Sequence, residues 1–350
     1  MVEDQPTRIA RRNCSLGRSV AIALIVSVAL AGVQARAQCS SLASYAQLAP
    51  TPINIIVNEQ ILAVANRSDV VGAMQVWGEL TSCIVKLNIE TKVDVVGSQT
   101  EIRRRILDSK VDLLVLDSMQ FTKLSDAGLL DGVAVTSNAG HPSLYTYLLL
   151  VDQQTTSLAQ LHSKRAVFYA TTGSSASLAW MATLLAKEHL GKIETFFGPS
   201  EISNKATSCI LPLFFGRVQA CIISRLDWDL VKEMNPQLGS KIKILAESRP
   251  VLESVTAMPK RLIPHRQQII DSLLTMHNYP AGNQILSLVK SGPMIPYRPE
   301  YIESTRLFWE EYVLTLTPAE RLVRNDSEQS IVPKQFGQTN GVLNNFEAIH

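Results

Sequence analysis

Short apolar runs alternate with stretches of helical periodicity over residues 50–135. Runs rich in β-branched residues predict strands, whereas apolar positions three and four residues apart predict helices. By these criteria, we predict strands at 53–57, 92–96, 111–116 and 133–135, and helices at 68–86, 100–109 and 119–127. This alternation is typical of a sheet with parallel strands and helices on its faces.

A second series of the same kind follows the apolar run "YTYLLLV" at 145–151. Here we predict strands at 166–170, 220–224 and 241–245, and helices at 157–162, 174–190, 204–215 and 226–234. After "SVTAMP" the pattern predicts helices at 263–276, 281–290 and 299–314, and residues 325–350 form a polar tail.

The two series predict a two-lobed α/β fold, in which each lobe is a mostly parallel sheet flanked by helices. The extended segments 147–151 and 252–257 would cross between the lobes as hinges. Lobe one would comprise residues 50–146 plus 257–320, and lobe two would be the inserted segment 151–250. Ligands of open α/β sheets bind outside the carboxyl ends of the strands, so we expect a ligand cleft between the lobes.

Polar residues that follow the predicted strands are therefore the candidate ligand-binding residues. They are Asn58, Glu59, Asp117, Ser118, Thr171, Thr172, Ser174, Ser175, Ser177, Ser224 and Arg225.

The stretch "FYATTGSSASLAW" at 168–180 carries most of these hydroxyls. Gly173 permits a tight turn, and Ser174 or Ser175 can cap the helix that follows. Unpaired N–H groups and the positive end of the helix dipole favour an anion there, and the hydroxyls add donors. Phosphate, phosphonate or sulfonate suits this chemistry. The alternative interpretation is a well-capped helix with incidental serines.

The first 37 residues have the pattern of a secretory signal peptide. Four arginines between Arg8 and Arg18 precede the apolar segment "VAIALIVSVALAGV", and Ala35-Arg36-Ala37 gives a small-x-small cleavage site. We expect export to the periplasm and cleavage before Gln38, the alternative being a retained N-terminal anchor. The remaining chain has 28 basic and 29 acidic residues, which does not indicate a nucleic-acid partner.

Four cysteines remain after this cleavage, namely Cys39, Cys83, Cys209 and Cys221. An oxidising compartment permits two disulfides. We favour Cys209 with Cys221, because a short helix and its return strand bring such positions together; two buried thiols are the alternative, and pairing of Cys39 with Cys83 stays open. No metal or cofactor is expected, since neither cysteines nor histidines have ligand spacing.

Four segments carry a family resemblance, in an order and spacing that agree with it. They are "SQTEIRRRILDSKVDLLVLDS", "SLAQLHSKRAVFYATTGSSASLAWMATLL", "SNKATSCILPLFFGRVQACIIS" and "KIKILAESRPVLESVTAMPKRLI". The chain resembles the phosphate/phosphonate-type periplasmic substrate-binding proteins of ABC transporters, within the type II periplasmic binding protein fold. The resemblance covers roughly residues 50–315. It implies a receptor that captures a small oxyanion between its lobes and delivers it to a permease.

The sequence departs from the family pattern at Ser163, at Gln219-Ala220 and at Asp117-Ser118-Met119. Glu59 and Asp117 would repel an anion unless they meet an ammonium group or a ligand hydroxyl. We therefore expect an anionic or zwitterionic ligand, and an aminoalkylphosphonate would reconcile the two lobes; the alternative is that Glu59 points to solvent.

A sensory protein of the same fold, read by a membrane-bound signalling partner, is the alternative function. An enzyme is not expected, since Ser174 has no G-x-S-x-G context and no histidine follows a predicted strand. Two conspicuous groups are given structural interpretations. Arg103-Arg104-Arg105 is interpreted as a solvated helix face, and the four tryptophans as packing, with Trp228 the best candidate for a ligand contact.

Overall fold

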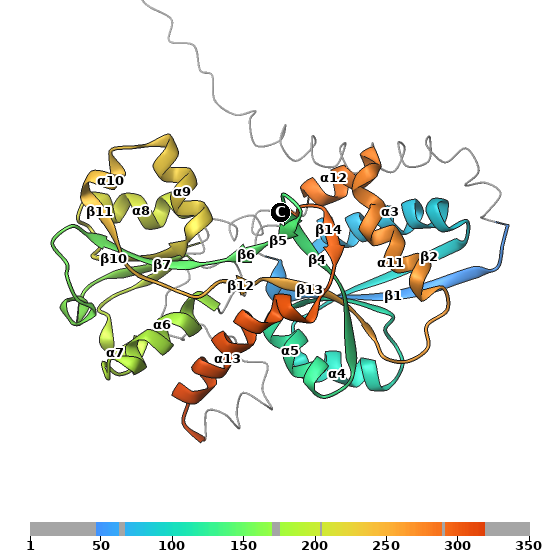
Figure 1. Cartoon of the computed structure of the whole chain (residues 1–350), viewed down its shortest axis with the longest axis horizontal. Helices are drawn as coiled ribbons and strands as arrows, with labels where there is room; N and C mark the ends of the chain where they lie inside the picture. The colour runs from blue at the N-terminus through green and yellow to red at the C-terminus, as the bar shows by residue number, and fades with distance from the viewer. Residues whose placement is uncertain (1–46, 63–66, 170–175, 204, 289–290, 319–350) are drawn as a thin grey trace, which may run out of the picture.

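The computed structural model describes residues 47–62, 67–169, 176–203, 205–288 and 291–318. These residues form two α/β lobes joined by extended strands, as Figure 1 shows. The predicted two-lobed α/β architecture is thus confirmed. Among the described helices, none is long and apolar enough to cross a lipid bilayer.

The sheet of lobe one has the strand order β14-β4-β13-β3-β1-β2, with β5 paired to β4. Its strands are β1 (Pro50–Asn58), β2 (Asn88–Val96), β3 (Leu113–Asp117), β4 (Leu130–Asn138), β5 (His141–Pro142), β13 (Ser254–Pro259) and β14 (Met294–Pro296). β1 pairs in parallel with β2 and β3, whereas β13, β4 and β14 pair antiparallel.

Helices cover both faces of this sheet (Figure 1). One face carries α3 (Arg67–Val85), α11 (Arg266–Thr275) and α12 (Pro280–Leu288), and the other carries α4 (Gln99–Leu107) and α5 (Ser118–Asp126). Ile53, Ile55 and Val57 belong to the first core cluster and Ile56 to the second. β1 has apolar residues on both of its faces because helices bury both faces of the sheet. Short 3₁₀ turns at η1 (Glu59–Ile61), η3 (Met276–Asn278) and η4 (Pro299–Ile302) complete the lobe.

Lobe two has the strand order β11-β7-β10-β8-β9. Its strands are β7 (Tyr147–Asp152), β8 (Ala166–Tyr169), β9 (Glu201–Ser203), β10 (Ala220–Ser224) and β11 (Ile242–Glu247). One face is covered by α6 (Ala176–Lys187) and α7 (Ile193–Phe196), and the other by α8 (Ala206–Phe214), α9 (Arg225–Met234) and α10 (Leu238–Lys241). The 3₁₀ turn η2 (Leu158–Leu161) follows β7.

Both sheets are mixed, which corrects the expectation of mostly parallel sheets. β10 pairs in parallel with β8 but antiparallel with β7, and β3 pairs antiparallel with β13. β7 and β13 are the strands that enter each lobe from the crossing segments. Because they arrive from the other lobe, they run against the strands of the local strand–helix series.

The expected single strand at 145–151 is divided into two. β6 (Leu144–Tyr145) pairs with β12 (Val251–Leu252) between the lobes, whereas β7 begins at Tyr147 inside the lobe-two sheet. The chain changes sheets between Tyr145 and Tyr147, so one apolar run supplies two strands. The antiparallel pair β6–β12 is the connection between the lobes (Figure 1).

The last described helix, α13 (Glu303–Thr315), corrects the expectation that residues 257–320 belong wholly to lobe one. Ile302, just before it, is buried in a lobe-one cluster. Phe308, Trp309 and Tyr312 are instead buried with the lobe-two residues of α6 and α7. α13 therefore spans from one lobe to the other, because its aromatic face completes the lobe-two core.

Cys209 and Cys221 form a disulfide in the structure, with a Cα–Cα distance of 5.5 Å. Both residues are fully buried between α8 and the sheet. Cys83 on α3 is also disulfide-bonded.

Candidate functional site

Four of the predicted ligand-binding residues, Thr171, Thr172, Ser174 and Ser175, lie outside the described residues. The other seven can be placed at the ends of strands and the starts of helices. Asn58 is the last residue of β1, and it is fully buried with its amide Nδ2 3.5 Å from the Val96 carbonyl oxygen. Its position therefore links the ends of β1 and β2 rather than presenting the amide to solvent.

Asp117 and Ser224 end strands in different lobes, and each caps the helix that follows. Asp117 Oδ1 accepts a hydrogen bond of 3.0 Å from the backbone N–H of Gln120, and Ser224 Oγ accepts one of 3.1 Å from the N–H of Asp227. A short polar side chain directly after a strand therefore starts both α5 and α9. The strand-end pattern in the sequence located these residues because it also encodes helix caps.

Asp117 keeps one carboxylate oxygen without a described partner. Its Oδ2 is buried and accepts no hydrogen bond from the described residues. Burial raises the pKa of Asp117 to about 6, against the lowering effect of the backbone hydrogen bonds from Gln120 and Met119. The carboxyl is thus poised to bind a proton or a donor group near neutral pH.

Ser177 lies in the first turn of α6 and is fully buried. No described residue gives its Oγ a hydrogen-bond partner. An unpaired buried hydroxyl costs about 1–3 kcal/mol. This hydroxyl is therefore the described part of the Ser/Thr-rich corner that most needs an external partner.

The remaining predicted residues have other partners or face solvent. Ser118 is buried, and its N–H donates to the Glu253 carbonyl oxygen over 3.1 Å. Arg225 donates through Nε to Glu247 Oε1 over 3.0 Å and pairs with the same carboxylate through Nη2. Glu59 is exposed. The Arg225 guanidinium therefore forms an ion pair within lobe two.

Four residues that were not predicted from the sequence form a polar cluster beside these strand ends. The Tyr145 hydroxyl hydrogen-bonds the Glu253 carboxylate, and the Tyr169 hydroxyl hydrogen-bonds the Asp227 carboxylate. The two pairs also interact, because each tyrosine lies in the field of both carboxylates. Tyr145 and Glu253 come from the crossing segments, whereas Tyr169 and Asp227 come from lobe two. We name these four residues the Tyr/acid cluster.

The electrostatics of the Tyr/acid cluster are dominated by burial and negative charge. Burial raises the pKa of Tyr169 to about 12 and that of Tyr145 above its usual range. Glu253 reaches solvent, but the surrounding protein and the nearby Asp227 charge still raise the pKa of its carboxyl. Among the described residues, neither carboxylate has an ion-pair partner. The cluster can therefore receive a cation or a hydrogen-bond donor.

A sequence signal for one member of the cluster was present. Asp227 stands three residues after the cap Ser224, in the S-x-x-D spacing typical of a helix start. Ser224 Oγ also donates to Asp227 Oδ2, which holds this carboxylate at the strand end. Glu253 carries no such signal, because its position depends on the pairing of β6 with β12.

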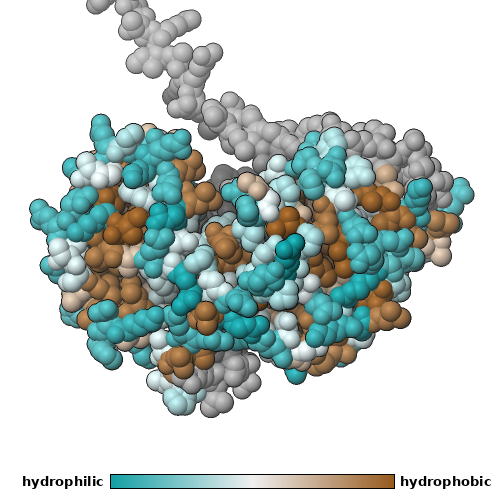
Figure 2. Space-filling model, viewed as in Figure 1, coloured by the Kyte–Doolittle hydropathy of each residue, from teal (hydrophilic) through white to brown (hydrophobic). Residues whose placement is uncertain are grey.

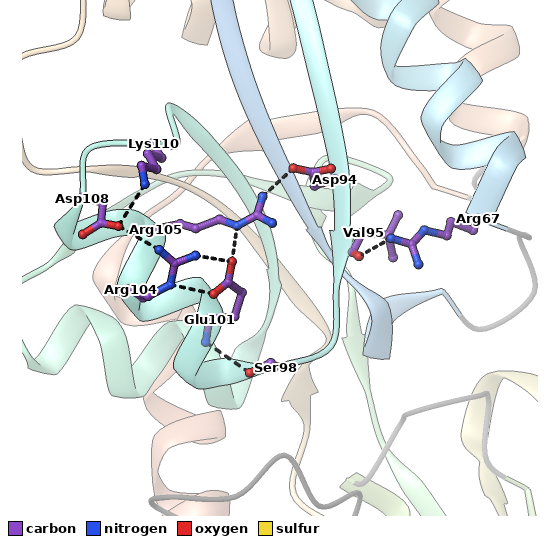
Figure 3. Close-up of polar contacts among 9 residues, drawn as sticks. All are labelled: Arg67, Asp94, Val95, Ser98, Glu101, Arg104, Arg105, Asp108 and Lys110. Carbon is purple, nitrogen blue, oxygen red and sulfur yellow. Dashed lines mark hydrogen bonds and ion pairs between the residues drawn. The ribbon is translucent and has the colours of Figure 1, made fainter.

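Two members of the arginine triple, Arg104 and Arg105, belong to an ion network on α4, which Figure 3 shows. Arg104 pairs with Glu101 and Asp108, and Arg105 pairs with Glu101 and Asp94. Hydrogen bonds from Arg104 and Arg105 lower the pKa of Glu101 to about 2. The network agrees with a solvated helix face. The four tryptophans, Trp77, Trp180, Trp228 and Trp309, are all buried, as packing requires.

Residues 77–300 match the family model described as "ABC transporter, phosphonate, periplasmic substrate-binding protein". No curated protein sequence matches the chain significantly.

Solved structures with the same fold include XAC2383 from Xanthomonas citri bound to ATP. It is 12% identical with a TM-score of 0.55, over 75% of this chain and 98% of that one. Another is a binding-protein component of an ABC phosphonate transporter from Pseudomonas aeruginosa. It is 12% identical with a TM-score of 0.50, over 78% of this chain and 92% of that one. At these identities the likeness shows the fold.

Proposed function

The chain belongs to the family of periplasmic substrate-binding proteins of phosphonate ABC transporters, and we propose that it captures a small oxyanion at the start of α6. The observation that carries the proposal is the fully buried Ser177 hydroxyl, which has no described hydrogen-bond partner. Tetrahedral oxyanions accept several hydrogen bonds and are favoured at helix N-termini. Thr171, Thr172, Ser174 and Ser175 stand directly before this helix in the sequence and would supply further donors.

The ligand proposed here also carries a positive charge. Asp227 and Glu253 lie close enough for the charge of one to raise the pKa of the other, and no described cation is paired with either. A purely anionic ligand would be repelled by this pair of carboxylates. An aminoalkylphosphonate places an ammonium group a few bonds from its phosphonate, so it would satisfy the acidic cluster and the hydroxyl corner together.

Transport is the function proposed for this capture, because the family consists of binding components of importers. Such a protein is a receptor and not an enzyme. Its location would be the periplasm, as the pattern of residues 1–37 predicts. A sensory role remains the alternative, and deletion of the gene for this chain separates the two. Loss of uptake supports transport, whereas an unchanged uptake with a lost transcriptional response supports sensing.

Titration calorimetry of the mature protein tests the ligand class. We expect 2-aminoethylphosphonate to bind more tightly than methylphosphonate or phosphate, because only the first carries an ammonium group. Equal affinities for all three would support the oxyanion site and reject the zwitterion. If none of the three ligands binds, both the oxyanion site and the zwitterionic ligand are rejected.

A further inference from the structure

An apolar stripe runs along the exposed side of α9. Its members are Leu226, Leu230 and Met234, which are 62%, 55% and 73% exposed. They stand four residues apart, so they share one side of the helix. Leu211 and Phe215, at the same spacing on and just after α8, are exposed at 39% and 66%. We name these five residues the α8–α9 surface; Figure 2 shows apolar side chains over this part of lobe two.

This surface is not needed to build the lobe. α8 and α9 pack on each other, and their inward sides are already buried through Cys209, Ile210 and Leu213 on α8 and Trp228 and Val231 on α9. The five exposed side chains together present on the order of 500 Å² of apolar surface, if a large side chain has roughly 200 Å² to expose. Patches of this size on monomers are frequently binding sites.

The size and charge of the surface decide which partner it fits. A stable protein pair buries about 800 Å² on each partner, so this surface is too small for a permanent dimer but sufficient for the centre of a transient contact. Its exposed rim has both signs of charge, with Asp229, Glu233 and Lys232 on α9. A lipid surface would require an excess of basic residues, and the exposed charges of α9 beside the stripe give no such excess.

The same helix connects this surface to the Tyr/acid cluster. Asp227, in the first turn of α9, accepts the hydrogen bond from Tyr169, and Leu226 precedes it in the chain. α9 therefore carries a carboxylate of the proposed ligand site and an outward apolar stripe within ten residues. A partner that contacts the stripe would therefore be sensitive to the position of lobe two.

We propose that the α8–α9 surface is the place where lobe two docks on the periplasmic side of the transporter's own permease. The contact is reversible, with an apolar centre and a polar rim of mixed charge. The proposal rests on the transport function proposed above, since an importer requires the loaded receptor to bind and leave its permease.

Photo-crosslinking in intact cells tests the docking directly. p-Benzoylphenylalanine at Leu230 should crosslink to a multispanning ABC permease subunit, identified by mass spectrometry. The matched control is Leu262 in lobe one, which is 94% exposed and equally apolar. The proposal would be overturned if Leu230 gave no crosslinked product, or if it crosslinked to a second copy of this chain or to a soluble protein. A permease yield from Leu262 equal to that from Leu230 would overturn it as well.

A second measurement separates docking from ligand binding. Leu230→Asp should lower cellular uptake of 2-aminoethylphosphonate at least tenfold while its calorimetric affinity stays within twofold of wild type, and Leu262→Asp should change neither. Undiminished uptake by Leu230→Asp would reject the docking surface. If wild type binds no oxyanion while Leu230 still crosslinks to the permease, the docking holds and the proposed ligand fails.

Discussion

The Tyr145 hydroxyl hydrogen-bonds the Glu253 carboxylate where the two crossing strands β6 and β12 meet. Glu253 also accepts a backbone hydrogen bond from Ser118 of lobe one, over 3.1 Å. One residue of the return crossing therefore contacts the other crossing through its side chain and lobe one through its backbone. A ligand cation that competes with Tyr145 for this carboxylate would act at the hinge itself.

Replacing Glu253 tests the proposed cation site. Glu253→Gln should weaken binding of 2-aminoethylphosphonate about ten- to hundredfold, because a hydrogen bond to a charged group contributes about 1.5–3 kcal/mol. Affinity for methylphosphonate should be unchanged or higher, since one repulsive charge is removed. Titration calorimetry measures both, with Glu233→Gln on the exposed side of α9 as the control. An equal loss for the two ligands would contradict a cation site at Glu253.

The hydroxyl corner before α6 is tested at Ser175. Ser175→Ala should weaken oxyanion binding by roughly ten- to hundredfold. Ser175→Asp should weaken it further, because it sets a negative charge where the ligand charge would lie while still permitting a helix cap. Calorimetry with methylphosphonate on both variants measures the effect, and Arg103→Ala serves as the surface control. Full affinity in Ser175→Asp would place the anion elsewhere.

Asp117 gives a pH-dependent prediction for stability. Its pKa is about 6 in the folded protein against 3.8 ordinarily, so the folded state binds its proton more tightly. The contribution of the protonated Asp117 carboxyl to the free energy of unfolding is fully present below about pH 4 and is lost as the pH rises through about 6. Asp117→Asn keeps the helix cap and removes this dependence. The variant should gain up to about 3 kcal/mol relative to wild type between pH 4 and 7 in urea unfolding. A difference in unfolding free energy between Asp117→Asn and wild type that does not change with pH would contradict the raised pKa of Asp117.

Exported, oxidised protein should contain the Cys209–Cys221 disulfide, which non-reducing peptide mapping will detect. The double variant Cys209→Ala/Cys221→Ala should lose about 2–4 kcal/mol of unfolding free energy, since the bond closes a loop with a sequence separation of 12. Ligand affinity should persist, because the pair is buried beneath α8 and not beside α6. Free thiols at both positions would refute the pairing.

Export is predicted to remove residues 1–37. N-terminal sequencing of the periplasmic protein should begin at Gln38, and its mass should lack the five arginines of the leader. An intact Met1 on a membrane-retained form would show an anchor instead.

The sequence predicted the strand–helix series well because each unit is locally encoded. In lobe one, the strand that ends at Asp117 and the helix that begins at Ser118 follow from an apolar run and a capping residue. The same logic located Ser224 in lobe two. Local patterns were sufficient wherever one residue both ended a strand and started a helix.

Pairing between distant segments was beyond such patterns. Tyr145 and Glu253 come together only because β6 pairs with β12, more than a hundred residues later. The antiparallel strands β7 and β13 were missed as such for the same reason, since an apolar run has no direction. The aromatic face of α13 likewise indicated burial without indicating against which lobe.

The path of α13 bears on the construction of optical biosensors from this chain. β1 begins in lobe one, whereas α13 ends against lobe two, where Glu311 pairs with Lys187 and Arg249. Fluorescent proteins fused before Pro50 and after Thr315 would consequently be attached to different lobes. Any rotation of one lobe against the other would alter their separation, and energy transfer between them would report ligand capture without a reporter inserted into either sheet.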